Sequence, residues 1–146
     1  MTRPDRRLIY LLSVAYRRME TRLRALGDTS GAQAGVLFYL HAHEGAALSD
    51  LAHALAMGLP GTSGLVDRMV TAGLVERRAH DHDGRQWQLF LTRRGHATRD
   101  VASTIAADLN TKLAGDFTDK ELEVVARWLA HVAATFAPTK TKENES

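Results

Sequence analysis

The segment 48–78, "LSDLAHALAMGLPGTSGLVDRMVTAGLVERR", constrains the fold of this 146-residue chain more than any other part. It contains two short apolar runs with helical spacing, and a turn of a few residues separates them. The expected inward-facing residues are Leu51, Ala52, Leu55, Leu65, Val66 and Met69. Gly73 follows the second run, where a helix end favours a residue that tolerates positive φ. The segment therefore predicts two closely packed helices, at about 49–55 and 59–72.

After Gly73 the apolar period changes from helical to alternating, which is typical of strands. The runs "LVERRAH" and "QWQLFLT" flank "DHDG", in which Asp83 and Gly84 both accept the positive φ of a tight turn. Trp87, Leu89 and Leu91 alternate along the second run, so they share one face, and we expect all three to pack in the core. These features predict a two-stranded hairpin turning at Asp83–Gly84.

Further helices are expected on both sides of this segment. An apolar stripe along 5–26 predicts a first helix, and the capping-box spacing of Ser30 and Gln33 predicts a second, buried helix that continues to about 43. Thr92 can cap a helix at 93–114. Thr118 and Glu121 form another capping box, followed by an apolar stripe that ends before Pro138. The tail 138–146 has a composition typical of disorder.

The composition excludes several classes of protein. With 45% hydrophobic and 25% charged residues, the chain is too apolar to be disordered, and its apolar runs are too short to span a membrane. It has no cysteine, so disulfides, thiolate zinc sites and thiol redox switches are excluded, and a reducing cytoplasm is expected. The net charge of +2 is small, but six arginines and no lysine lie between 68 and 94.

The order helix, turn, helix, hairpin is that of a winged helix-turn-helix, and the sequence resembles the MarR family of bacterial transcription regulators. The pieces "LSDLAHAL", "LVDRMVTAGLVERR" and "DGRQWQLFLTRRG" carry the resemblance, which covers nearly the whole chain. It implies a mainly α fold with a small β-wing, in one domain at 1–137. The winged helix-turn-helix would occupy about 46–92, and dimerisation helices would occupy about 5–27 and 93–137.

The resemblance also implies a function. A cytoplasmic homodimer would bind double-stranded DNA at a pseudo-palindromic operator, and a small-molecule effector would release this repressor. Arg85 would enter the minor groove, and Asp83 would orient the wing or serve only the turn. Arg68, Arg77 and Arg78 would contact phosphates or pair with Asp83. The first two turns of the expected recognition helix would contribute Pro60, Gly61, Thr62 and Ser63.

This recognition helix departs from the family's usual pattern, because "GLPGTSG" lacks the long polar side chains that pair with base edges. Two interpretations stay open. The small residues could permit close approach and leave specificity to thymine methyl groups, wing insertion and DNA shape. Alternatively, DNA recognition could be weak or lost, and the chain would be a winged-helix module that binds a protein.

Other expected sites follow from the flanking helices. The dimer contacts would come from Leu8, Leu12, Leu122, Val125, Leu129, Val132 and Phe136, although the last five could instead form intramolecular core. By resemblance, Tyr16, Arg17, Tyr39 and His41 would line an effector cleft between the dimerisation helices and the winged domain. Each of these four residues is equally explained as an ordinary surface or core residue.

We expect neither an enzyme nor a cofactor. "GTSG" around Ser63 lacks the second glycine of a nucleophile elbow, and the chain has no phosphate-binding glycine-rich loop ending in Gly-Lys. The chain has seven histidines, but His41 and His43 diverge on a helix. His80 and His82 lack a supporting ligand set, so no metal site is expected.

Overall fold

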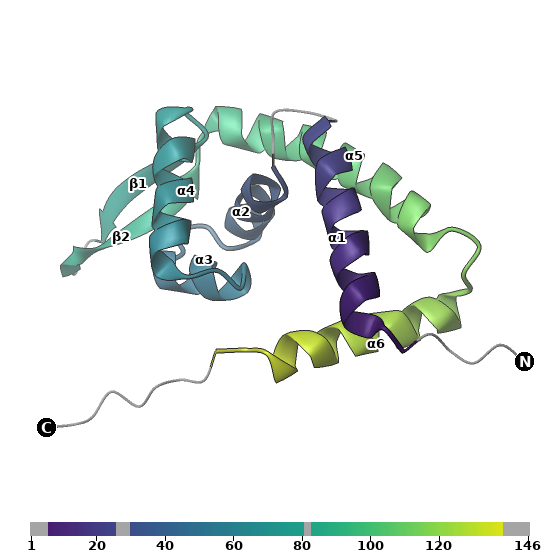
Figure 1. Ribbon diagram of the computed structural model, residues 1–146. Helices are drawn as coiled ribbons and strands as arrows, with labels where there is room; N and C mark the ends of the chain where they lie inside the picture. Colours follow the sequence, from purple (N-terminus) through teal and green to yellow (C-terminus); the bar gives the residue numbers. More distant parts are fainter. Residues whose placement is uncertain (1–5, 26–29, 81–82, 139–146) are drawn as a thin grey trace, which may run out of the picture. The chain divides into compact units, whose positions relative to one another are not determined.

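A computed structural model of the chain describes residues 6–25, 30–80 and 83–138. The chain divides into two compact units, Met1–Ala102 and Ser103–Ser146. The first unit holds α1 (Leu8–Ala25), α2 (Gly31–Ala42), α3 (Leu48–Ala54), α4 (Leu59–Thr71), β1 (Val75–His80) and β2 (Asp83–Leu91) (Figure 1). Helix α5 (Arg93–Ala114) crosses the boundary, and α6 (Asp119–Thr135) lies in the second unit. The predicted mainly α fold with a small β-wing is confirmed.

The core of the first unit forms around α2. Its Val36, Leu37 and Leu40 are fully buried, as the apolar run in this segment predicts. They pack with apolar residues of α3, α4 and the hairpin, namely Leu51, Leu65, Val66, Met69, Val75, Leu89 and Leu91. The α2 helix begins where its cap predicts, because the Ser30 hydroxyl accepts a hydrogen bond of 3.2 Å from the Gln33 amide. This cluster holds α4 and the hairpin against one another.

The turn from α4 into the hairpin depends on Gly73, which has φ +76° as predicted. Thr92, at the other end of the hairpin, donates a hydrogen bond of 2.6 Å to the Gly73 carbonyl and accepts one of 3.0 Å from the Gly95 amide. The Thr92 side chain thus caps α5 and ties its start to the end of α4. The predicted helical cap at Thr92 is confirmed.

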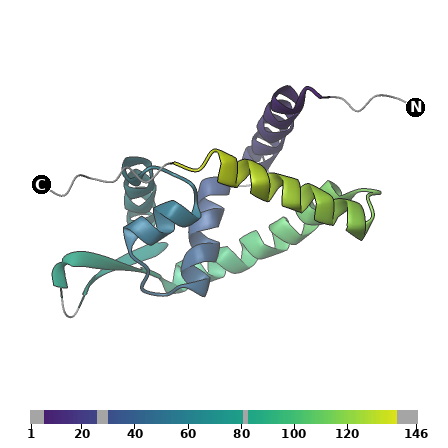
Figure 2. The same ribbon diagram turned by 90° about the horizontal axis from the view of Figure 1, so that it is seen from below.

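The hairpin projects beyond the helices of the first unit (Figure 2). Its two strands are antiparallel, with Val75 opposite Leu91 and Ala79 opposite Trp87. A short bridge adds the segment before α3 to the sheet, because Leu89 and Ala46 pair across it. Only the base of the hairpin is in the core, since Val75, Leu89 and Leu91 are buried there. The outer part is free to contact another molecule.

The two helices expected at the ends of the chain have apolar side chains on their surfaces. In α1 no residue is buried, and Leu8, Ile9, Tyr10, Leu11, Leu12 and Tyr16 are exposed. In α6 the Thr118 capping box forms as predicted, and no residue is buried either. Among the residues that the structure describes, no helix is both long and apolar enough to cross a bilayer.

Candidate nucleic-acid interface

Helix α4 presents a face of small and apolar side chains in its first turns. It begins after Gly58, which provides no side-chain cap, and has Pro60 in its first turn. Leu59 is 53% exposed, and Pro60 and Gly61 are exposed beside it. Leu65, Val66 and Met69 form the buried face, as predicted. The exposed face therefore offers little hydrogen-bonding chemistry until Asp67 and Arg68 one turn later.

Thr62 differs from the expectation that it contacts DNA. Its side chain is fully buried, and its hydroxyl donates a hydrogen bond of 2.9 Å to the Gly58 carbonyl. A buried and bonded hydroxyl is not available to a base edge, so the prediction is wrong for Thr62 in this conformation. Ser63 is partly exposed and is the remaining hydroxyl in the "GLPGTSG" segment.

The end of the hairpin also differs from the prediction. His80 pairs with Asp83, so Asp83 and Gly84 belong to β2. The predicted turn at Asp83–Gly84 is therefore wrong. The register shifts between Ala79 and His80, because Gly84, Arg85 and Gln86 separate the partners Asp83 and Trp87 on β2. The side chains of Asp83 and Arg85, like those of His80 and His82, lie outside the described residues.

Two of the three arginines predicted to contact phosphates or to pair with Asp83, namely Arg77 and Arg78, form ion pairs with other carboxylates. Arg77, on β1, forms an ion pair with Asp67 of α4. This contact ties the hairpin to the helix. Arg68 has an exposed side chain on α4. Its guanidinium group remains a candidate for phosphate contact.

Arg78 lies on the other face of the hairpin. It donates a hydrogen bond of 3.0 Å to Glu76 and lies 4.2 Å from the centre of the Phe90 ring. The hydrogen bond and the charge of Glu76 raise the pKa of Arg78 above its usual value.

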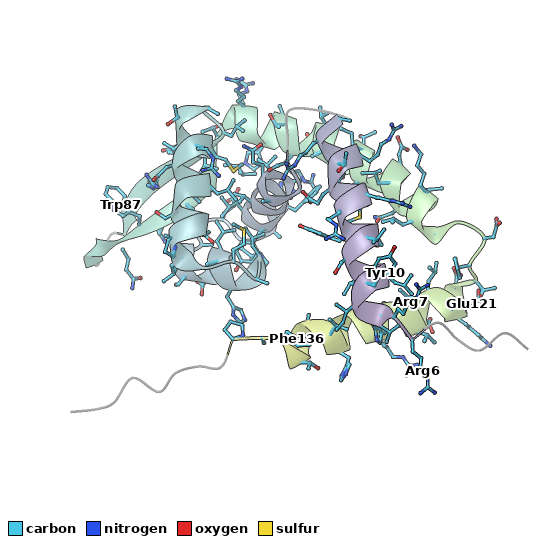
Figure 3. All side chains as sticks on the ribbon, in the orientation of Figure 1. Arg6, Arg7, Tyr10, Trp87, Glu121 and Phe136 are labelled. Atoms are coloured by element: carbon cyan, nitrogen blue, oxygen red, sulfur yellow. The ribbon has the colours of Figure 1, made fainter. Side chains whose placement is uncertain are left out.

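A groove of about 1000 Å³ lies between α4 and the hairpin, and Ala47, Leu48 and Ser49 at the start of α3 also line it. Leu59, Ser63 and Val70 of α4 line one wall, and Arg77, Trp87 and Leu89 of the hairpin line the other. Trp87 is 55% exposed, so the prediction that it packs in the core is wrong. It lies on the same face of β2 as Leu89 and Leu91 but beyond the end of the core, towards the outer part of the hairpin (Figure 3).

Comparisons with known proteins agree with this geometry. A family model described as MarR family matches residues 28–86, which include α2, α3, α4 and most of the hairpin. Mutant MarR from E. coli, complexed with operator DNA, is similar in structure, with 25% sequence identity and a TM-score of 0.75 over 86% of this chain and 91% of that chain. The segment 28–86 is thus similar in sequence to the MarR family.

Other solved structures match the chain over almost their whole length. The S. aureus MepR–DNA complex has 22% identity and a TM-score of 0.82, covering 90% of this chain and 99% of that chain. The PcaV regulator from Streptomyces coelicolor, in complex with its natural ligand, has 20% identity and a TM-score of 0.84, covering 92% of this chain and 98% of that chain. No curated protein sequence matches the chain.

The four effector residues predicted from the MarR resemblance come from α1 and α2. Tyr16 and Arg17 are exposed on α1. The Tyr39 ring stacks on His43 with ring centres 4.4 Å apart, and His41 Nδ1 lies 3.4 Å from Nδ1 of His96. His41 and His43 diverge, as predicted. Among the described residues, no group of three or more histidine, aspartate or glutamate side chains is placed to hold a metal ion.

Four residues of this candidate site were missed by sequence reasoning. Asp67 and Glu76 are the partners of the arginines, and Leu59 and Trp87 are apolar side chains in the groove. Strand register could have placed Arg77 on the α4-facing side, because it lies opposite Leu89. The order of residues alone does not indicate which carboxylate forms an ion pair with each arginine.

Proposed function

We propose that this chain is a dimeric transcription regulator of the MarR family that binds duplex DNA and acts as a repressor released by a small-molecule effector. The single observation that carries the proposal is the pairing of a solvent-facing α4 with a projecting hairpin, joined by the Asp67–Arg77 ion pair. A helix of this kind fits the major groove, and a hairpin beside it reaches the adjacent minor groove. The DNA complexes of MepR and MarR support this assignment.

The chemistry of α4 indicates how the helix would contact DNA. Gly61 and Gly64 have no structural need to be glycine, since an added Cβ would meet only Met57 Cε at 3.7 Å or Arg68 Nη1 at 3.6 Å. Each costs about 1 kcal/mol in helix propensity relative to alanine. Close approach of the helix backbone to the bases would explain why glycine is present despite this loss of helix stability. Specificity would then come from thymine methyl groups, wing insertion and DNA shape.

Exposed apolar residues of the terminal helices support a homodimer. Leu8 and Leu12 of α1 and Val125, Leu129 and Phe136 of α6 are all more than one third exposed, and Phe136 is 80% exposed. Leu122 and Val132 are partly buried along the same stripe of α6. A single copy leaves this surface in water, which a second copy would cover. The two copies would bind two half-sites of a pseudo-palindromic operator.

An effector would act by a population shift. A ligand that prefers a dimer with unsuitable spacing of its two α4 helices would lower DNA affinity by the size of that preference. The complex of PcaV with its natural ligand supports a ligand site in this fold. Tyr16, Arg17, Tyr39 and His41 stay our candidates for it, and a cytoplasmic location and the absence of catalysis stay predictions.

Replacing Arg85 with alanine is expected to weaken binding to most duplexes. Arg85 lies on β2 next to the turn of the hairpin, where the family places a minor-groove arginine. With one cation fewer at the interface, DNA binding releases about one counterion fewer, so the magnitude of the slope of log affinity against log salt should fall by about one. Fluorescence anisotropy with a labelled duplex at several salt concentrations measures both quantities. An unchanged slope would place Arg85 outside the interface.

Replacing Gly61 with alanine is expected to stabilise the protein and weaken DNA binding. The helix should gain about 0.5–1 kcal/mol of unfolding free energy, because the new methyl group meets no obstacle. The same methyl group would hold the helix away from the bases and lower affinity about tenfold. Urea unfolding and anisotropy on the same sample separate these effects. Full DNA affinity in the stabilised variant would contradict close approach.

One observation favours a second candidate function. The first two turns of α4 carry no arginine, lysine, asparagine or glutamine, so direct pairing with base edges is weak there. The chain could then be a winged-helix module that binds a protein through the hairpin. Failure of the protein to bind any duplex at low salt would favour this second function.

A further inference from the structure

We propose that Trp87 and Leu59 form an apolar clamp for the sugar-phosphate strand of duplex DNA that crosses the groove between α4 and the hairpin. The inference rests on the proposed function, because it needs the chain to bind duplex DNA. It adds a contact that depends neither on base sequence nor on charge. Trp87 makes the larger part of this contact.

The position of Trp87 follows from the register of the hairpin. Val75, Arg77 and Ala79 lie opposite Leu91, Leu89 and Trp87, so these six residues share one face of the hairpin. Arg77 bonds to Asp67, which shows that this face looks towards α4. Burial falls along β2 from Leu89, which is 1% exposed, to Trp87, which is 55% exposed. Trp87 therefore overhangs the groove where the core has ended.

Leu59 is the apolar counterpart on the other wall. It is the first residue of α4 and is 53% exposed, and it lines the same groove as Trp87. Covering the exposed halves of this tryptophan and this leucine with another molecule would be favourable, because apolar surface would leave water. Their shared groove lies between the two elements proposed to bind DNA, so the apolar surface continues that interface.

The geometry of duplex DNA selects the occupant. Neighbouring major and minor grooves are separated by one sugar-phosphate strand. If α4 enters the major groove and the hairpin enters the minor groove, that strand must pass between them, over this groove. The strand alternates phosphates with deoxyribose rings, whose C–H edges are apolar. The groove also combines polar and apolar groups, because Arg77, opposite Leu89, and Trp87, one pair further along the hairpin, line it together with Leu59 and with Ser63 one helical turn later.

Trp87 can report on its own contact, since Trp128 is the chain's other tryptophan. The variant Trp128→Phe leaves Trp87 as the sole source of tryptophan fluorescence and keeps an aromatic ring in α6. We expect its emission to shift to the blue, and its quenching by acrylamide to fall, when a mixed-sequence duplex of about 30 base pairs is added at low salt. Unchanged emission and quenching on a bound duplex would overturn the clamp.

The affinity test separates an apolar contact from a phosphate contact. Trp87→Ala should weaken binding about tenfold, the change expected when roughly 50 Å² of apolar surface is no longer buried. The slope against salt should not change, because no cation is lost. Trp87→Phe should recover part of the affinity, and Leu59→Ala should repeat the effect of Trp87→Ala. Because deoxyribose occurs in every nucleotide, all duplexes should lose affinity by the same factor.

The remaining outcomes each contradict the clamp in a different way. A fall in both affinity and salt slope for Trp87→Ala would mean that the wing has moved and phosphate contacts are lost with it. A blue shift that follows protein concentration without DNA would assign the groove to a second copy of the chain. If the duplex binds but only T-rich duplexes lose affinity, Trp87 contacts thymine methyl groups instead. Absence of any duplex binding by the wild-type protein would overturn the proposed function itself.

Discussion

Replacing Gly95 with alanine should lower the free energy of unfolding by about 3 kcal/mol, the largest loss of stability expected from adding a single methyl group to this chain. A Cβ at Gly95 would lie 2.1 Å from the Leu74 carbonyl oxygen and 3.1 Å from the Leu74 carbonyl carbon. Both are backbone atoms, so the methyl group cannot be accommodated by turning a side chain. The start of α5 would have to move away from the junction between α4 and β1.

Urea unfolding followed by circular dichroism measures this loss. All samples should have one protein concentration, because a dimer's apparent stability depends on it. Gly64→Ala is the matched control: it adds the same methyl group within a helix, where the nearest outside atom is Arg68 Nη1 at 3.6 Å. This control should be as stable as the wild type or more stable. A Gly95→Ala variant within 1 kcal/mol of the wild type would contradict the close approach of α5 to Leu74.

Replacing Leu129 with glutamate should convert the protein to a monomer at micromolar concentration and lower operator affinity about 100-fold. Leu129 is 45% exposed in the middle of the apolar stripe of α6, so a carboxylate there can stay hydrated in the single copy. In a dimer the same carboxylate would be buried without a partner, which is strongly unfavourable. A monomer binds one half-site and loses the advantage of two linked contacts.

The control for Leu129→Glu is Arg127→Glu. Residues two positions apart on a helix point about 200° apart, so this glutamate lies on the opposite face of α6. Sedimentation velocity gives the oligomeric state, and anisotropy with the operator gives the affinity. The Arg127→Glu variant should remain a dimer. A Leu129→Glu variant that stays dimeric with full affinity would exclude the α6 stripe from the dimer interface.

The local sequence predicts much of this fold because helix signals act over a few residues. The bounds of α4 and α5, the positive φ of Gly73 and the caps at Ser30, Thr92 and Thr118 all follow from spacing and residue type. The buried faces of α2 and α4 follow from apolar periodicity. Each of these features is decided by neighbours along the chain.

Most predictions that the structure contradicts concern features set by contacts between segments distant in the sequence. Alternation puts Trp87 on the face of Leu89, but the core ends before Trp87 is covered. Thr62 is an exception, because its helical spacing to Leu65 and Met69 already places it on the buried face of α4, where its hydroxyl donates a hydrogen bond to the Gly58 carbonyl. Asp83 and Gly84 belong to β2 and not to the predicted turn, because the pairing of His80 with Asp83 and the irregular register extend the strand to them.

The candidate site was only partly predictable for the same reason. A recognition helix followed by a basic hairpin is visible in the order of elements. Arg77 and Asp67 are ten residues apart in the sequence, and their ion pair depends on how the hairpin packs against α4. The groove between them, with Leu59 and Trp87 on its two walls, exists only once both elements are placed.

The central claim is that this chain recognises a particular duplex as a dimer, and selection from a random pool of duplexes tests it most directly. We expect enrichment of a two-fold-symmetric sequence whose half-sites lie about one helical turn, or a multiple of it, apart. Anisotropy at physiological salt should show this duplex bound at least about 1000-fold more tightly than its scrambled version. No enrichment, together with equal binding of both duplexes or none, would contradict the claim.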